Sequence, residues 1–167
     1  MKTNIKNISI AGLFTALIFI GAYIHINLPY GGYANLSDCM VILAASSLPM
    51  LFGIFSSVVG SVIADISLGF AHYAAASAII KGIMALIVNI ICRNKSKNLS
   101  SKHIIAAISA EIIMVLGYLG YEYIIIGYVG ALYNILGNVL QGLISVVLSA
   151  LFYTAIAKNS YLKKYFL

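Results

Sequence analysis

Long runs of apolar residues alternate with short polar segments along the chain, and the length of the runs predicts helices that cross a membrane. A helix needs about 20 mainly apolar residues to span the hydrocarbon core of a bilayer. Six runs can be drawn, at 8–27, 37–51, 53–69, 74–92, 103–122 and 130–157. Between the second and third, SLPMLFG contains Pro49 and Gly53, which favour a tight turn between antiparallel helices. We therefore predict an all-α integral membrane protein with six transmembrane helices.

The composition agrees with this prediction. Hydrophobic residues make up 62% of the chain and charged residues 8%, against roughly 45–50% and about 25% in soluble domains. Six spans fill most of the 167 residues, so we expect a single membrane-embedded domain over residues 1–167. The basic start followed by an apolar run resembles a signal peptide, but the run continues to about Ile26 without an A-x-A cleavage site. We interpret it as a retained first helix.

The positions of lysine and arginine predict the orientation, because these residues accumulate in cytoplasmic loops. The segments 28–36, 70–73 and 123–129 contain neither residue. Nine of the ten basic residues lie before the first run, between the fourth and fifth, or after the sixth: Lys2, Lys6, Arg93, Lys95, Lys97, Lys102, Lys158, Lys163 and Lys164. We therefore predict that both termini and the 93–102 loop are cytoplasmic.

Ionisable residues inside the apolar runs are candidates for function, because a charge in the hydrocarbon region is costly unless it is paired or hydrated. Lys81, the tenth basic residue, lies in the fourth run, and Asp65 lies near the outer end of the third. These two helices should be neighbours, so Lys81 and Asp65 form either a structural ion pair or the edge of a hydrated cavity that contacts a polar ligand. Glu111, nearer the cytoplasmic side, is interpreted as a contact between helices.

The predicted outer side is rich in tyrosine and glycine, in INLPYGGYANLSD, GFAHY and YEYIIIGYVG. Tyrosines at this level either form an interfacial belt or line a pocket that opens outward. Tyr33 and Tyr73 are the candidates for stacking on a ligand. His72 is either a solvated loop residue or a contact for a heteroaromatic ring.

Three amides follow one another in YNILGNVLQG, within the sixth run. Asn134, Asn138 and Gln141 are spaced i, i+4 and i+7 and therefore share one helix face. They either bond to neighbouring helices or line a cavity for a hydroxylated heterocycle, since each carboxamide offers donors and an acceptor.

Motifs for several chemistries are missing from the sequence. It contains no GxxxxGK[ST], no HExxH and no GxSxG, so we expect no ATP hydrolysis by this chain, no metal, no cofactor and no catalytic residues. Cys39 and Cys92 lie in separate runs without metal-ligand spacing. We therefore favour the interpretation that this chain is a binding protein. A proton-driven carrier acting through Asp65 or Glu111, and an intramembrane enzyme, are the alternatives.

Several stretches together resemble the substrate-binding S components of energy-coupling factor (ECF) vitamin transporters. The resemblance is closest to the group labelled ECF-type riboflavin transporter S component, whose members are linked to hydroxymethylpyrimidine and pyridoxine-like substrates. The matching stretches are GLFTALIFI, LPYGGYANLSD, GSVIADISLGFAHYAAASAIIKGIMALI, EIIMVLGYLGYE and YNILGNVLQG.

This resemblance implies a six-helix subunit of the prokaryotic plasma membrane that binds a vitamin or precursor near the outer face. It also implies docking onto a membrane-embedded coupling subunit that carries two cytoplasmic ATPases. The family's Ala-xxx-Ala docking motif reads Gly12-xxx-Ala16 here. The loop Pro29–Ser37 would cap the site. The substrate-binding residues expected on this basis are Lys81, Asn134, Asn138, His72, Tyr33, Tyr73, Asp65 and Gln141. Hydroxymethylpyrimidine or a pyridoxine-like heterocycle is the expected ligand, with riboflavin or another heterocycle as the alternative.

Overall fold

The computed structural model describes residues 2–93 and 99–166, and nearly all of them are helical. The elements in chain order are α1 (Lys2–Tyr23), β1 (His25–Asn27), β2 (Tyr33–Asn35), α2 (Ser37–Ser47), α3 (Met50–Ser67), the 3₁₀ helix η1 (Ala71–Tyr73), α4 (Ala74–Arg93), α5 (Leu99–Lys158) and α6 (Ser160–Phe166). Within the described part of the chain, α1, α3, α5 and the continuous η1–α4 segment are long and apolar enough to cross a membrane. The predicted class, an all-α membrane protein, is confirmed at this level.

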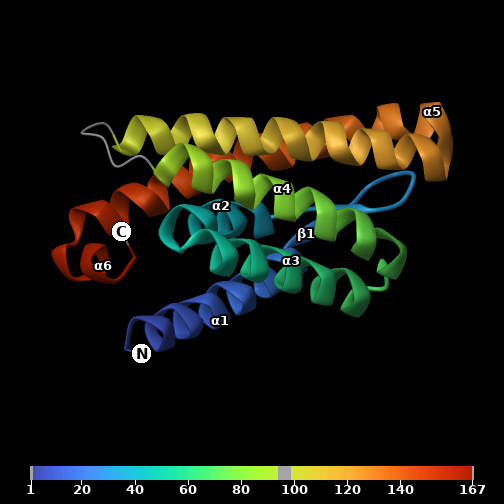
Figure 1. Cartoon of the computed structure of the whole chain (residues 1–167). Coiled ribbons are helices and arrows are strands. Elements are labelled where there is room, and N and C mark those ends of the chain that lie inside the picture. The colour runs from blue at the N-terminus through green and yellow to red at the C-terminus, as the bar shows by residue number, and fades with distance from the viewer. Residues whose placement is uncertain (1, 94–98, 167) are drawn as a thin grey trace.

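Helix α5 joins the fifth and sixth predicted runs in one element of 60 residues. It folds back at Gly127, whose φ of 80° and ψ of 172° lie outside the helical region, and Figure 1 shows its two arms running side by side. The rings of His103 and Tyr153 stack with centroids 4.1 Å apart, so the arms are antiparallel. The reversal falls inside the predicted 123–129 loop. Six membrane crossings stay a prediction.

Helix α2 occupies the centre of the bundle, between α5 and α3 (Figure 1). Val41, Ile42 and Ala44 on different sides of this helix are all fully buried, as expected for a helix that is hydrophobic all round. Its 11 residues give a length of about 16 Å, roughly half of the hydrocarbon core. The run predicted at 37–51 is therefore shorter than expected, and Pro49 begins the turn into α3 as predicted.

Both chain termini lie at one end of the bundle, and the bend of α5 lies at the other (Figure 1). This arrangement agrees with the predicted clustering of basic residues at one membrane face. Residues 94–98 of the predicted basic loop 93–102 lie outside the described residues. The assignment of that face to the cytoplasm stays a prediction.

Small residues let α3 pack closely against two other helices. A Cβ atom added to Gly60 would lie 2.9 Å from both the Ile18 Cβ and the Thr15 carbonyl oxygen of α1, and one added to Gly53 would lie 3.1 Å from the Ala45 Cα of α2. Close approach of backbones through small residues is the usual way in which membrane helices associate. Gly53 and Gly60 therefore serve packing within this chain.

A two-stranded antiparallel hairpin replaces the irregular outer loop expected at 28–36. Strand β1 pairs with β2 in the register His25 with Asn35 and Asn27 with Tyr33. Gly31 and Gly32 turn the chain with φ of 107° and 76°, values that favour glycine because it lacks a Cβ atom. The hairpin follows α1 directly and precedes α2.

The α1–α3 contact yields a first prediction. Gly60→Ala should lower the melting temperature of the purified protein, with a loss of about 1–3 kcal/mol from overpacking, because the Thr15 carbonyl is backbone and cannot move aside. Gly120→Ala is the matched control, since nothing lies within 4 Å of its added Cβ. Equal melting temperatures for the two variants would contradict the proposed close packing.

Candidate functional site

A polar cavity lies between the hairpin and helices α1, α3, α4 and α5, next to η1. Its volume is about 20 Å³, room for about one water molecule. The lining side chains come from six helical elements, α2 included, and from the hairpin: Ala22, Tyr33, Asn35, Ser37, Ser61, Asp65, Tyr73, Ser77, Lys81, Tyr118, Glu122, Asn138 and Gln141. The exterior of the bundle is apolar, with Leu51 and Ile124 about three-quarters or more exposed. Polar groups therefore collect inside the protein, the reverse of a soluble fold.

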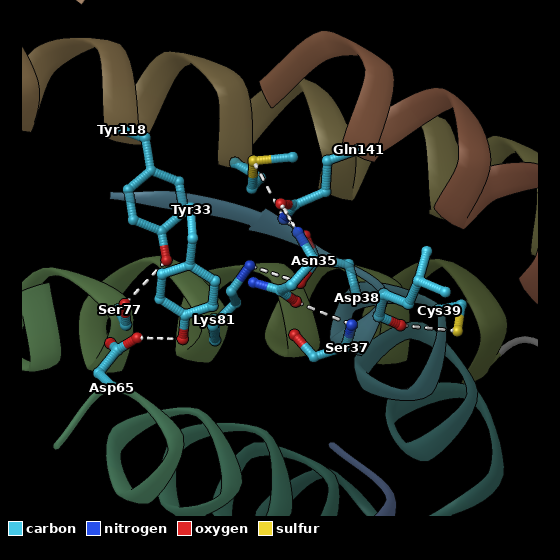
Figure 2. Close-up of polar contacts among 12 residues, drawn as sticks. Tyr33, Asn35, Ser37, Asp38, Cys39, Asp65, Ser77, Lys81, Tyr118 and Gln141 are labelled. Atoms are coloured by element: carbon cyan, nitrogen blue, oxygen red, sulfur yellow. Dashed lines mark hydrogen bonds and ion pairs between the residues drawn. The ribbon is translucent and has the colours of Figure 1, made fainter. Parts of the chain in front are cut away.

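A buried ion pair between Lys81 and Asp38 forms one wall of the site (Figure 2). Asp38 lies in the first turn of α2 and is fully buried, and Lys81 is 2% exposed. The second oxygen of Asp38 accepts a hydrogen bond of 2.6 Å from the Gln141 amide. The Gln141 oxygen accepts one of 2.7 Å from the backbone N–H of Asn35. One hydrogen-bonded chain thus links α4, α2, α5 and the hairpin.

The predicted pairing of Lys81 with Asp65 is wrong in this structure. Asp65 accepts a hydrogen bond of 2.6 Å from the Tyr33 hydroxyl, and Lys81 is paired with Asp38 instead. Asp38 is not among the predicted binding residues, although it lies in the predicted run 37–51, and in the structure it is in the first turn of α2 at the centre of the bundle. Burial, and after it the Asp65 carboxylate, raise the pKa of Tyr33, so the phenol stays protonated and donates its hydrogen.

Tyrosine rings form the second wall. The Tyr118 hydroxyl and the Ser77 hydroxyl are hydrogen-bonded at 2.8 Å, and the ammonium of Lys81 lies 5.3 Å from the centre of the Tyr118 ring. The Tyr73 ring lies 6.2 Å from that of Tyr118. The Tyr73 hydroxyl donates a hydrogen bond of 3.3 Å to the Glu122 carboxyl group.

The three amides of α5 share one buried face, as their spacing predicts, but they divide between two tasks. Asn138 and Gln141 line the cavity. Asn134 donates a hydrogen bond of 2.9 Å to the carbonyl of Gly31 and so holds the hairpin turn. Asn134 is not among the side chains that line the cavity.

His72 also lies outside the cavity lining. It is exposed on η1, and its ring packs 4.8 Å from that of Tyr73. The structure therefore brings six of the eight predicted binding residues together at the cavity: Tyr33, Asp65, Tyr73, Lys81, Asn138 and Gln141.

The sequence interpretation left out several groups that the structure adds: Asp38, Ser77, Tyr118 and Glu122. One feature of the sequence, the scarcity of acidic residues, could have identified Asp38 and Glu122. The chain has only four acidic residues, and each of them lies in or beside an apolar run. All four are at most 5% exposed.

Some polar atoms around the cavity have no hydrogen-bond partner among the residues that the structure describes. They include one carboxylate oxygen each of Asp65 and Glu122, the amide nitrogen of Asn138 and the hydroxyl of Ser61. Buried polar groups are normally hydrogen-bonded, and each exception calls for an explanation. These atoms are the ones that a bound small molecule can satisfy.

An apolar helical shell around a small polar cavity, covered by a hairpin, defines a helical membrane protein with a buried polar site. The sequence model of the family described as ECF-type riboflavin transporter, S component, matches residues 2–158, and the chain belongs to this family. Membership implies a substrate-binding subunit of an ECF transporter for vitamins, which associates with partner subunits. This is a transporter family and not an enzyme family.

A relative from Pyrococcus woesei, described as an uncharacterized protein in the gap 3' region, is 29% identical over 117 residues. The match covers 70% of this chain and 77% of the relative. Its description names no ligand, so the ligand of this chain has to be argued from the cavity.

The Lys81–Asp38 pair yields the second prediction. Lys81→Met should lower the free energy of unfolding by about 3–5 kcal/mol, because it leaves the Asp38 carboxylate buried without a cation. The double variant Lys81→Met/Asp38→Asn should recover most of that loss, since it removes both charges. Chemical denaturation of the four proteins of this cycle in detergent measures the coupling. A double variant less stable than Lys81→Met would contradict the pairing.

Proposed function

We propose that this chain captures a small vitamin or vitamin precursor, a hydroxymethylpyrimidine or pyridoxine-like heterocycle, in the cavity beneath the hairpin. The observation that carries the proposal is the cluster of unpartnered polar atoms and tyrosine rings around one buried cavity. Ligand sites combine apolar and aromatic walls with a few placed polar groups. The proposed contacts are Lys81, Asp65, Asn138, Gln141, Tyr33 and Tyr73, with Asn134 acting through the hairpin turn and His72 at the rim.

The size of the cavity favours a single-ring ligand over riboflavin. At about 20 Å³, the cavity has to expand for any heterocycle, and a single ring requires less expansion than the three fused rings of a flavin. An apolar pocket of about 410 Å³ lies on the other side of the hairpin. Asn35 and Gln141 line both spaces, so a shift of this contact enlarges the cavity.

The hairpin is the proposed cover of the site. Its turn is tied to α5 by the Asn134–Gly31 hydrogen bond, and Leu28 lies in the notch that Gly137 leaves on the same helix. Its second strand is held by the Asn35–Gln141 and Tyr33–Asp65 hydrogen bonds, so opening the cover would require all of these contacts to separate. Outward movement of the hairpin would admit the ligand.

ATP-driven uptake would be supplied by partner subunits, a coupling subunit in the membrane and two cytoplasmic ATPases. Gly12 and Ala16 are exposed on one face of α1, and nothing lies within 4 Å of a Cβ added to Gly12. A smooth, exposed face of this kind permits close approach of a partner helix. We propose it as the docking surface in the prokaryotic plasma membrane.

A self-sufficient proton-coupled carrier is the second candidate. It is favoured by Glu111, which is buried with neither carboxylate oxygen hydrogen-bonded within the described residues. Liposomes that contain this chain alone separate the two candidates. Uptake without partner subunits would support the carrier and contradict the binding subunit.

The third prediction concerns ligand binding. Hydroxymethylpyrimidine or pyridoxine should raise the melting temperature of the purified chain without ATP, with a stabilisation of about 4 kcal/mol at a thousandfold excess over Kd. Asn138→Leu should remove this shift, because Asn138 lines the cavity, and the ligand-free melting curve of the variant checks that it folds.

Asn89→Leu is the matched control and should behave in the opposite way. The Asn89 amide donates to the carbonyls of Ala45 and Leu48 at 3.0 Å each, away from the cavity. This variant should melt at a lower temperature and keep the ligand-induced shift. A shift that survives in Asn138→Leu would remove Asn138 from the site.

The fourth prediction concerns docking. Ala16→Leu should abolish vitamin uptake by cells that also produce the coupling subunit and ATPases, while the isolated variant binds ligand as the wild type does. The added side chain projects from an exposed helix face and blocks close approach. Ala75→Leu, at an exposed position of α4, should leave both properties unchanged. Normal uptake by Ala16→Leu would exclude this face as the docking surface.

A further inference from the structure

The charges around the cavity are unbalanced. Asp65, Glu122 and Lys81 line it, but the ammonium of Lys81 is already paired with Asp38 outside the lining. The second carboxylate oxygen of Asp38 accepts a hydrogen bond from the Gln141 amide. The two remaining carboxyl groups, Asp65 and Glu122, therefore have no ion-pair partner of their own among the described residues that line the cavity.

Each of these carboxyl groups is half satisfied. Asp65 accepts from the Tyr33 hydroxyl through one oxygen, and Glu122 accepts from the Tyr73 hydroxyl through one oxygen. The other oxygen of each group makes no hydrogen bond of normal geometry in the described structure, although the Ser77 hydroxyl lies near Asp65 and the Asn138 amide lies near Glu122. The tyrosines are neutral donors, so they solvate the carboxylates without balancing their charge. Leaving such groups unpaired is costly.

Aromatic rings surround the same space. Tyr33, Tyr73 and Tyr118 line the cavity, and Tyr73 and Tyr118 are separated by 6.2 Å between ring centres. Carboxylates set among tyrosine faces attract cations, because the face of an aromatic ring carries negative charge density. The ring of Tyr118 already lies 5.3 Å from the Lys81 ammonium, which shows that this wall tolerates positive charge.

We infer that the site selects a basic nitrogen heterocycle, bound as a cation or through N–H groups, with one donor directed to Asp65 and a second to Glu122. An amino-substituted ring with a basic ring nitrogen has this chemistry. The free amide nitrogen of Asn138 supplies a donor for a hydroxyl or ring-nitrogen acceptor on the same ligand. Anionic vitamins, with a carboxylate or phosphate, are rejected by the two acids. This inference rests on the proposed function and narrows its substrate class.

Matched ligands test the inference on the wild-type chain by titration calorimetry. The 4-amino form of hydroxymethylpyrimidine should bind about ten- to hundredfold more tightly than its neutral 4-oxo analogue, the range expected for hydrogen bonds to a charged group. Pyridoxal 5'-phosphate, as the anionic probe, should bind more weakly than pyridoxine. Equal affinities for the amino and oxo forms, or tighter binding of the phosphate, would overturn the inference.

Two near-isosteric variants test the residues. Asp65→Asn and Glu122→Gln each keep an oxygen for the tyrosine donor, and each should lower affinity for the 4-amino ligand about tenfold or more. The 4-oxo analogue should lose much less affinity in both variants. Glu111→Gln is the control, since it removes an equally buried acid that does not line the cavity. Ligand-free melting curves check that every variant folds.

The outcomes distinguish this inference from the function on which it rests. Tight binding of a heterocycle with the same affinity in wild type, Asp65→Asn and Glu122→Gln would overturn the charge-based selection and leave the binding subunit standing. No binding by any ligand of the panel would overturn both. An equal loss in Glu111→Gln would attribute the effect to general electrostatics and overturn the assigned contacts.

Discussion

The buried ion pair between Lys81 and Asp38 is the interaction on which the site depends. Removing two charges from water is expensive, and their attraction offsets this only when the remaining hydrogen-bonding capacity is also used. The Gln141 amide donates a hydrogen bond to the second carboxylate oxygen of Asp38. The side-chain oxygen of Gln141 in turn accepts one from the backbone N–H of Asn35. The pair therefore fixes the relative positions of three helices and the hairpin, and it leaves the other two acids of the cavity free for a ligand.

The apolar exterior and polar interior follow from one constraint. Lipid offers no hydrogen bonds, so polar side chains find hydrogen-bond partners only in the interior of the protein. Small residues bring the helices close enough for this, as at Gly60, where the Ile18 side chain and the Thr15 carbonyl fill the space of a missing Cβ. The site forms where the helices separate and the hairpin enters between them, and membership of the S component family is in keeping with this arrangement.

The length of the apolar runs predicted the membrane class, Pro49 and Gly53 predicted the turn, and residue spacing predicted the amide face of α5, because these depend on local sequence. None of these signals predicted the ion partner of Lys81. That pairing depends on α2, whose entry into the core is a tertiary feature. The pairing of β1 with β2 was missed for a similar reason, since it depends on the conformations of Gly31 and Gly32 and on contacts between strands, whereas the reversal at Gly127 falls inside the predicted 123–129 loop.

The hairpin has a kinetic consequence. Any molecule that leaves the cavity must first separate the Gly31 carbonyl from Asn134 and the Asn35 backbone from Gln141. Gln141 is also a proposed ligand contact, so the cover and the site share this residue. A substitution at Gln141 would therefore change the lifetime of a complex together with its selectivity, whereas Asn134 holds the cover from outside the cavity lining.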